Sequence, residues 1–248
     1  MRKIIAYILP TFIKKLIKKI IIQIKFLSKL IKKIIIQIKF LLIKNPEGIV
    51  SHHFSIHSSK DHENYAMFNY IFSTLEGKPL NIFETGSSAW GTNSSILFDS
   101  YIRKFGGTFT TVDIRPEPSY ELKNILSKNS KTVIEDSVKF IDEYKKTYFE
   151  NLDLIYLDSF DLDLNNPEPS MNHGYKEFSL LDKKIRNGCI IIIDDTPCDL
   201  NYFDSDIISN QDFSFIPGKG TLILNEIKES NNYEILFHEY ALVIKKIN

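Results

Sequence analysis

Short apolar runs alternate with amphipathic stretches along most of the chain. The apolar runs lack a strict apolar-polar alternation, as is typical of strands covered on both faces. Most of them end at acidic residues, and helix-like segments with apolar positions on one face separate several of them. This order predicts β-α-β-α units and a parallel sheet. The predicted strands are 80–86, 109–113, a short one beginning at 133, 152–160 and 188–197, and the predicted helices are 94–105, 119–128 and 175–187.

The pattern changes after Pro197. Residues 220–227 and 233–246 are both apolar, and the short polar segment 228–232 connects them. We expect two more strands here, forming an antiparallel hairpin that closes a mostly parallel seven-stranded sheet. The predicted fold class is therefore α/β, with helices on both faces of the sheet in a three-layer sandwich.

The formal net charge of zero hides an uneven distribution. Residues 1–45 contain 12 of the 31 Lys and Arg residues and no acid, which leaves 31 − 12 = 19 basic against 31 acidic residues in the remainder. The motif LIKKIIIQIKFL occurs at 16–27 and again at 30–41. At ~100° per residue, the lysines from 14 to 44 fall within about 160° of a helix, which predicts a basic amphipathic helix.

Several roles fit this arm. Its frequent lysines argue against a helix that spans the membrane, and it lacks the features of a secretory signal. A helix lying on an anionic membrane surface explains both faces. The 14-residue repeat also allows self-association as a coiled coil, and a duplication without a role is the third alternative. Nucleic acid fits poorly, because the body is acidic and the arm has few arginines.

Residues 46–75 contain four of the six histidines, His52, His53, His57 and His62. Their spacing is compatible with a metal site, but a polar linker that becomes a lid is favoured because no cysteine or acidic cluster accompanies them. The expected organisation is thus an arm (1–45), a linker or lid (46–75) and one domain (76–248). The two cysteines fit reduced thiols in a cytoplasmic protein, peripheral on the inner membrane face if the arm binds there.

A glycine-bracketed turn follows the first predicted strand, at Gly86 and Gly91. Such a turn lets the backbone approach a ligand closely. The sequence lacks the middle glycine of a dinucleotide fingerprint and the lysine of a phosphate-binding loop. Asp113, at the end of the next strand, is positioned to bind a ribose.

Glu84-Thr-Gly86 resembles the first motif of class I S-adenosylmethionine-dependent methyltransferases, with one extra residue before Gly91. Over residues 60 to 248 the chain looks most like the branch of macrocin-type sugar O-methyltransferases and cephalosporin hydroxylase-like proteins. That branch has a strand ending in Asp, then H-x-Y, then a strand ending in Asp-Asp. The resemblance implies a Rossmann-like domain in which the cofactor contacts Glu84, Gly86, Ser87, Gly91, Asp113, Asp136 and Ser137.

Asp158, Asp194 and Asp195 would meet at the carboxyl ends of two neighbouring strands. Three adjacent carboxylates repel one another unless a cation joins them, and an oxygen-only set favours Mg²⁺. The alternative is that the aspartates cap turns or bind backbone groups. For catalysis, His173 is the candidate base, with His238 as its substitute, beside Asp158.

We therefore expect an S-adenosylmethionine-dependent O-methyltransferase with divalent metal assistance, acting on a hydroxyl of a sugar or glycan precursor. The sugar rests on the resemblance alone. The alternatives are a hydroxylase-like enzyme on the same fold, and a membrane-associated scaffold that binds the cofactor without turnover. Trp90, the only tryptophan, is either a core anchor or a wall of the pocket.

Overall fold

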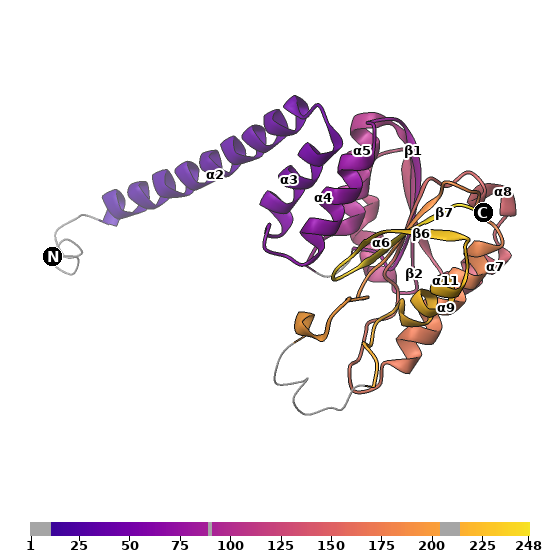
Figure 1. Ribbon diagram of the computed structural model, residues 1–248. Helices are drawn as coiled ribbons and strands as arrows, with labels where there is room; N and C mark the ends of the chain where they lie inside the picture. Colours follow the sequence, from indigo (N-terminus) through magenta and orange to yellow (C-terminus); the bar gives the residue numbers. More distant parts are fainter. Residues whose placement is uncertain (1–10, 89–90, 204–213) are drawn as a thin grey trace. The chain divides into compact units, whose positions relative to one another are not determined.

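A seven-stranded sheet organises the part of the chain that a computed structural model describes, residues 11–88, 91–203 and 214–248. Trp90 lies outside these described residues, as do the first ten residues of the arm. The strand order is β3-β2-β1-β4-β5-β7-β6 (Figure 1). The strands are β1 (Leu80–Thr85), β2 (Gly107–Asp113), β3 (Ser130–Ile134), β4 (Leu154–Leu157), β5 (Ile190–Ile193), β6 (Tyr233–His238) and β7 (Leu242–Lys246).

The first five strands pair in parallel, and β7 pairs antiparallel with both β5 and β6. This confirms the predicted fold class: a mostly parallel sheet of seven strands with an antiparallel hairpin at its C-terminal end. All side chains of β4 are buried, which explains why this strand shows no polar alternation. The parallel strands end at one edge of the sheet, where β1, β2 and β4 carry the predicted site residues.

One predicted strand is wrong. Residues 220–227 do not form a strand, because Thr221–Glu229 is helix α11. Ile223 and Ile227 are four residues apart and both are buried, as expected for one face of a helix. The count of seven strands still holds, because residues 233–246 supply two strands, β6 and β7, instead of one.

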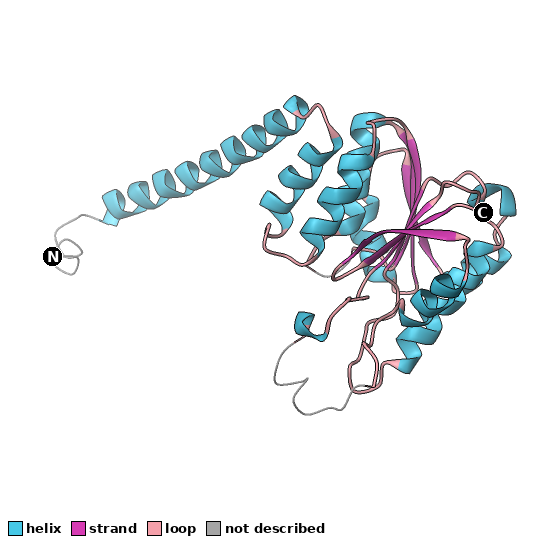
Figure 2. Ribbon diagram, viewed as in Figure 1, coloured by secondary structure: helices cyan, strands magenta, loops and turns pink. Residues whose placement is uncertain are grey.

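Helices cover both faces of the sheet (Figure 2). Helices α3, α4 and α5 lie on one side, and α7, α9 and α11 lie on the other (Figure 1). Phe83, Ile155 and Ile191 belong to a core on the second side, together with Phe178 of α9 and Ile223 of α11. The bounds are α3 (Pro46–His57), α4 (Asn64–Thr74), α5 (Ser94–Phe105), α6 (Pro116–Lys123), α7 (Ser137–Glu143), α8 (Lys146–Phe149) and α9 (Glu168–Asp182), with a short 3₁₀ helix at Leu200–Tyr202.

Residues 46–75, expected to be a polar linker or lid, contain the helices α3 and α4. Phe54, Phe68 and Phe72 are fully buried, and Phe68 contacts Phe98 of α5 and Tyr156 of β4. These aromatic contacts make the segment part of the body that extends from residue 45 to 248. The short connection between the two helices reaches the carboxyl edge of the sheet.

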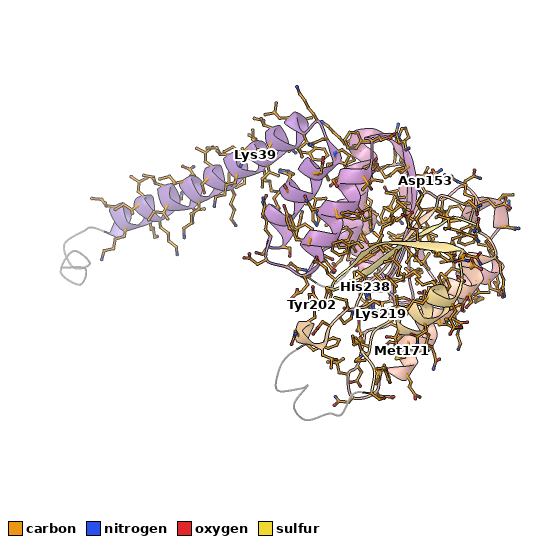
Figure 3. All side chains as sticks on the ribbon, viewed as in Figure 1. Lys39, Asp153, Met171, Tyr202, Lys219 and His238 are labelled. Atoms are coloured by element: carbon orange, nitrogen blue, oxygen red, sulfur yellow. The ribbon has the colours of Figure 1, made fainter. Side chains whose placement is uncertain are left out.

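Residues 1–44 form a separate unit, whose described part is mainly helix α2 (Thr11–Leu42). Its side chains project on all sides of the helix, Lys39 among them (Figure 3). Ile20, Ile24 and Ile31 are exposed. No helix in the described residues is long and apolar enough to cross a membrane.

Candidate functional site

The turn after β1 brings three strands close together. Gly86 has φ +77°, and its N–H donates to the carbonyl of Val112 on β2 at 2.9 Å. A Cβ at this position would lie 2.3 Å from the carbonyl oxygen of Asp158, which follows β4. Only glycine fits both the positive φ and this close approach, so the backbone forms an open cradle at the carboxyl edge of the sheet.

Glu84 stabilises this turn by binding the first residues of α5. Its carboxylate is fully buried and accepts hydrogen bonds from the hydroxyls of Ser94, at 2.5 Å, and Ser95. Burial raises the pKa of Glu84 to about 7, although the two serine hydrogen bonds oppose that rise. Glu84 does not line either of the cavities described below. Glu84 therefore fixes the start of α5. It can affect a bound ligand only by holding the turn in place.

Asp113 stands at the end of β2, next to Gly86. Its Oδ2 accepts from the backbone N–H of Ser87 at 2.9 Å and from Nη2 of Arg115 at 2.8 Å. Its Oδ1 accepts from the N–H and Nε of Arg115. Burial alone would raise the pKa of Asp113, but the hydrogen bonds from Arg115 and Ser87 outweigh it and lower that pKa. Asp113 is therefore a carboxylate at neutral pH, and a hydroxyl donor would bind it in place of one of the donors of Arg115.

Gly91 also has a positive φ, of +77°. A Cβ there would lie 2.8 Å from Nε2 of His62, in the connection between α3 and α4. The nearby carbonyl of Thr92 is 2.6 Å from Nε2 of His53, a buried histidine whose pKa burial lowers to about 4. Gly91 therefore lets the turn pack against residues 46–75 and lines neither cavity.

Asp136, Ser137 and His173 meet beside a cavity of about 320 Å³. Asp136 caps α7, accepting from the N–H of Lys139 at 2.8 Å. Nε2 of His173 lies 3.1 Å from Oγ of Ser137 and 3.4 Å from Oε1 of Glu177. Burial lowers the pKa of His173, but Glu177 and Asp136 outweigh that effect and raise it.

The carboxylates of Asp158 and Asp195 meet at a lysine that was not among the predicted site residues. Nζ of Lys219, a buried side chain, lies 2.6 Å from Oδ1 of Asp158 and 2.9 Å from Oδ2 of Asp195. Burial would lower the pKa of Lys219, but the charges of Asp158, Asp195 and Asp194 raise it above its ordinary value. Lys219 is therefore an ammonium ion among three carboxyl groups.

Two further oxygens of this cluster accept hydrogen bonds from tyrosine hydroxyls. The hydroxyl of Tyr240 donates to Oδ1 of Asp195 at 2.6 Å, and that of Tyr156 donates to Oδ2 of Asp194 at 2.6 Å. Burial and the charge of Asp195 raise the pKa of Asp194. Oδ1 of Asp194 and Oδ1 of Asn64 are buried without a hydrogen-bond partner among the described residues.

These donors bind carboxylate oxygens that were predicted to coordinate Mg²⁺. Magnesium requires near-octahedral oxygen coordination, whereas an ammonium group bridges two of the three predicted ligands. Within the described residues, no group of three or more His, Cys, Asp and Glu side chains is arranged to hold a metal ion. The donor set therefore does not fit a divalent ion. The sequence reasoning required a cation between the carboxylates, and in the structure that cation is Lys219.

A larger cavity of about 930 Å³ opens above the cluster. It shares Gly86, Arg115, Asp158 and Asp161 with the smaller cavity, so the two form one crevice. His173 lines only the smaller part, and His238 lines neither. The larger part is strongly acidic, being lined by seven carboxyl residues: Glu63, Glu117, Glu121, Asp158, Asp161, Asp194 and Asp195.

A sequence signal for Lys219 exists, although its partners are distant. Lys219 stands between Gly218 and Gly220. A Cβ on Gly218 would lie 2.7 Å from the carbonyl oxygen of Asp195, and one on Gly220 would lie 2.8 Å from Oγ1 of Thr196. The two glycines therefore let the lysine segment pack directly on the loop after β5. A lysine flanked by glycines can mark such a close approach.

No protein-family model matches the sequence, and a search of curated proteins finds no match. Among solved structures, a methyltransferase homolog protein from Pyrococcus horikoshii is similar, with a TM-score of 0.50 and 11% identity over 75% of this chain and 67% of that chain. A candidate methyltransferase from Streptococcus mutans in complex with SAH has a TM-score of 0.49 and 8% identity, covering 75% and 99%. Aeropyrum pernix fibrillarin with natively bound S-adenosyl-L-methionine has a TM-score of 0.40 and 15% identity, covering 69% and 68%. The likeness to the Pyrococcus protein shows that the two chains share an α/β fold.

Proposed function

We propose that the protein is an S-adenosylmethionine-dependent methyltransferase. The observation that carries this proposal is the crevice at the carboxyl ends of β1, β2 and β4, which has a glycine cradle at Gly86 and the ionised Asp113 at its side. In open α/β sheets, ligands bind in such a crevice. The Glu84-Thr-Gly86 motif and the fold point to the same cofactor.

The residues of the crevice suit the parts of S-adenosylmethionine. Gly86 and Ser87 would hold the amino acid end, Asp113 would accept the ribose hydroxyls, and Asp136 with Ser137 would bind the adenine. When bound, the cofactor supplies an electrophilic methyl group on a sulfonium. The position of His173, beside Ser137, favours a supporting role at the adenine rather than that of a base.

We propose that the acceptor is an uncharged or cationic compound that offers hydroxyl groups, such as a sugar. Lys219 offsets part of the charge of Asp158, Asp194 and Asp195, but four further carboxyl residues line the larger cavity against a single arginine, so a phosphate there would be repelled. Asp158 lines both parts of the crevice and is the side chain to which we assign contact with the reacting hydroxyl. The macrocin-type pattern Asp158, His173-Gly174-Tyr175 and Asp194-Asp195 supports a sugar as acceptor.

Methyl transfer from radiolabelled S-adenosylmethionine to a panel of acceptors tests the function. The panel contains neutral sugars, amino sugars and the matching sugar phosphates. We expect label to be transferred to a neutral or amino sugar, with a product heavier by one methylene group. Transfer to sugar phosphates alone would contradict the assignment of the acidic cavity.

The same assay separates the alternatives. Binding of S-adenosylhomocysteine without transfer to any acceptor would favour a cofactor-binding scaffold. Oxidation of an acceptor in place of methylation would favour a hydroxylase-like enzyme. The carboxylate-lysine cluster beside the crevice favours a catalytic role, because clusters of buried charged groups with shifted pKa values in a cleft are typical of functional sites.

We further propose that α2 holds the protein on an anionic membrane surface. The lysines would face the headgroups, while the exposed isoleucines and leucines enter the acyl boundary. A coiled coil between two copies is the alternative that the 14-residue repeat allows. Either arrangement would cover the apolar face of α2, which contains Ile20, Ile24 and Ile31.

A further inference from the structure

Lys219 occupies the centre of the carboxylate cluster at the ends of β4 and β5. Its side chain is 3% exposed, and its Nζ contacts carboxylates from the ends of two neighbouring strands. Its backbone N–H donates to the carbonyl of Asp195 at 2.9 Å. Asp195 itself has φ +41°, a conformation that non-glycine residues rarely adopt. The lysine is therefore fixed at both its backbone and its side chain.

The surroundings of Nζ resemble the oxygen environment of a hard cation. Asp158 and Asp195 each contribute one oxygen, and Asp194, with an unpartnered buried oxygen, completes the group of three carboxyl groups. Oxygen-rich carboxylate groups of this kind bind Mg²⁺ or Mn²⁺ when no protein cation is present. Here an ammonium group already stands between two of the carboxylates and would repel a second cation.

We propose that Lys219 is a built-in replacement for a divalent cation, which positions Asp158 and Asp195 at the crevice and makes the protein independent of metal. Lys219 is thus a positioning residue that acts through the two aspartates. What the aspartates act on rests on the proposed function, whereas the replacement of the cation does not.

Titration with Mn²⁺, followed by electron paramagnetic resonance of the free ion, tests this replacement on the full-length protein. The wild type should show no stoichiometric Mn²⁺ site. Lys219→Ala should gain one site that binds Mn²⁺ at least tenfold more tightly than any site of the wild type. The matched control is Lys246→Ala, which removes a lysine that is 3.0 Å from a single carboxylate, Asp182, and should gain no site.

Two results would overturn the proposal. One is a wild type that binds Mn²⁺ as tightly as Lys219→Ala does. The other is a folded Lys219→Ala, verified by circular dichroism, that gains no more Mn²⁺ binding than Lys246→Ala. If Lys219→Ala does not fold, the wild-type titration decides, because a stoichiometric site there contradicts the replacement and its absence supports it.

A calorimetric titration with S-adenosylhomocysteine on the same wild-type sample, with and without EDTA, separates this inference from the proposed function. Equal affinity in both conditions shows that cofactor binding needs no metal. Loss of the affinity for S-adenosylhomocysteine in EDTA would contradict the proposal that the protein needs no metal. No binding in either condition counts against the proposed function alone, because the Mn²⁺ result still decides what occupies the cation position.

Discussion

Glu84 is a carboxyl group whose protonation should affect the stability of the fold. Its pKa in the folded protein is about 7, against an ordinary value of 4.5, because burial disfavours the charged form. The folded state therefore holds a proton that the unfolded state loses between these two pH values. Stability from this group is fully present below pH 4.5 and is lost as the pH rises to 7.

Glu84→Gln should remove this pH dependence, because the amide stays neutral. Relative to the variant, the free energy of unfolding of the wild type should fall by up to ~3 kcal/mol as the pH rises from 4.5 to 7. Urea unfolding of both proteins across this range measures the difference. A constant difference between them would show that Glu84 is charged in the folded protein.

Asp113→Ala should weaken the binding of S-adenosylhomocysteine. The ribose hydroxyls would lose a charged acceptor worth about 1.5–3 kcal/mol, which is roughly 10- to 150-fold in the dissociation constant. The matched control is Asp153→Asn, since Asp153 also pairs with an arginine, Arg186, but precedes β4 at the opposite edge of the sheet. Isothermal titration calorimetry compares the three proteins, and equal affinities would refute the role assigned to Asp113.

The aspartates at the strand ends could be predicted from the sequence. The lysine that binds them could not. Asp113, Asp158 and Asp194 each follow an apolar run, so the pattern alone locates them at one edge of a parallel sheet. Lys219 lies 61 residues after Asp158 and follows no strand. Its position depends on how the chain returns from β5 to α11, which apolar periodicity does not encode. Electrostatics required a cation between the carboxylates, but not a particular one.

Among the elements, the turn between β1 and α5 gives the sharpest test of backbone geometry. Gly86→Ala combines a positive φ with a Cβ placed 2.3 Å from the carbonyl of Asp158. Gly188→Ala is the control, because φ is +89° there but the nearest atom to a Cβ, on Arg186, is 3.7 Å away. Both should lose about 1 kcal/mol to backbone strain, and Gly86→Ala should lose a further ~1–3 kcal/mol to overpacking. Urea unfolding measures both losses, and equal losses would contradict the close approach.

Helix α11 shows where the apolar pattern was ambiguous. In its sequence TLILNEIKE, three consecutive apolar residues follow the first threonine, which suits a buried strand. A short apolar run does not distinguish a strand from a buried helix. The spacing of Ile223 and Ile227 and the polar residues around Ile227 favour the helix that the structure contains. The antiparallel hairpin was predicted, but between 220–227 and 233–246, whereas both of its strands lie within 233–246.

Helix α2 should bind anionic membranes if its two faces act as proposed. Deleting residues 1–44 should release the protein from anionic vesicles, because each lysine near the surface contributes up to about 1 kcal/mol that salt screens. Sedimentation with anionic and neutral vesicles, at low and high salt, measures the binding. Binding of S-adenosylhomocysteine by residues 45–248 should be retained, because that unit contains the whole crevice.

Full-length protein with Lys18, Lys19, Lys32 and Lys33 changed to Gln is the control for charge, because it keeps the apolar face of α2. It should bind anionic vesicles more weakly than the wild type. Equal binding of the wild type to neutral and anionic vesicles, or no binding at all, would contradict the membrane proposal. Light scattering of the full-length and truncated chains would then test self-association.

For the whole molecule, the parallel sheet followed from the succession of apolar runs, because parallel strands need helical crossovers between them. The strand order, in which β1 lies between β2 and β4, did not follow from periodicity. It places the ends of β1, β2 and β4 together, and this juxtaposition forms the crevice. The packing of α3 and α4 was also not predicted, because the polar residues and histidines of this segment mask the apolar face formed by Phe54, Phe68 and Phe72.

We propose that this crevice binds S-adenosylmethionine. Isothermal titration of the full-length protein with S-adenosylhomocysteine tests this binding without the need for an acceptor. We expect one site per chain, with Asp153→Asn binding like the wild type and Asp113→Ala binding at least tenfold more weakly. No binding by the wild type, or binding that Asp113→Ala leaves unchanged, would contradict the account.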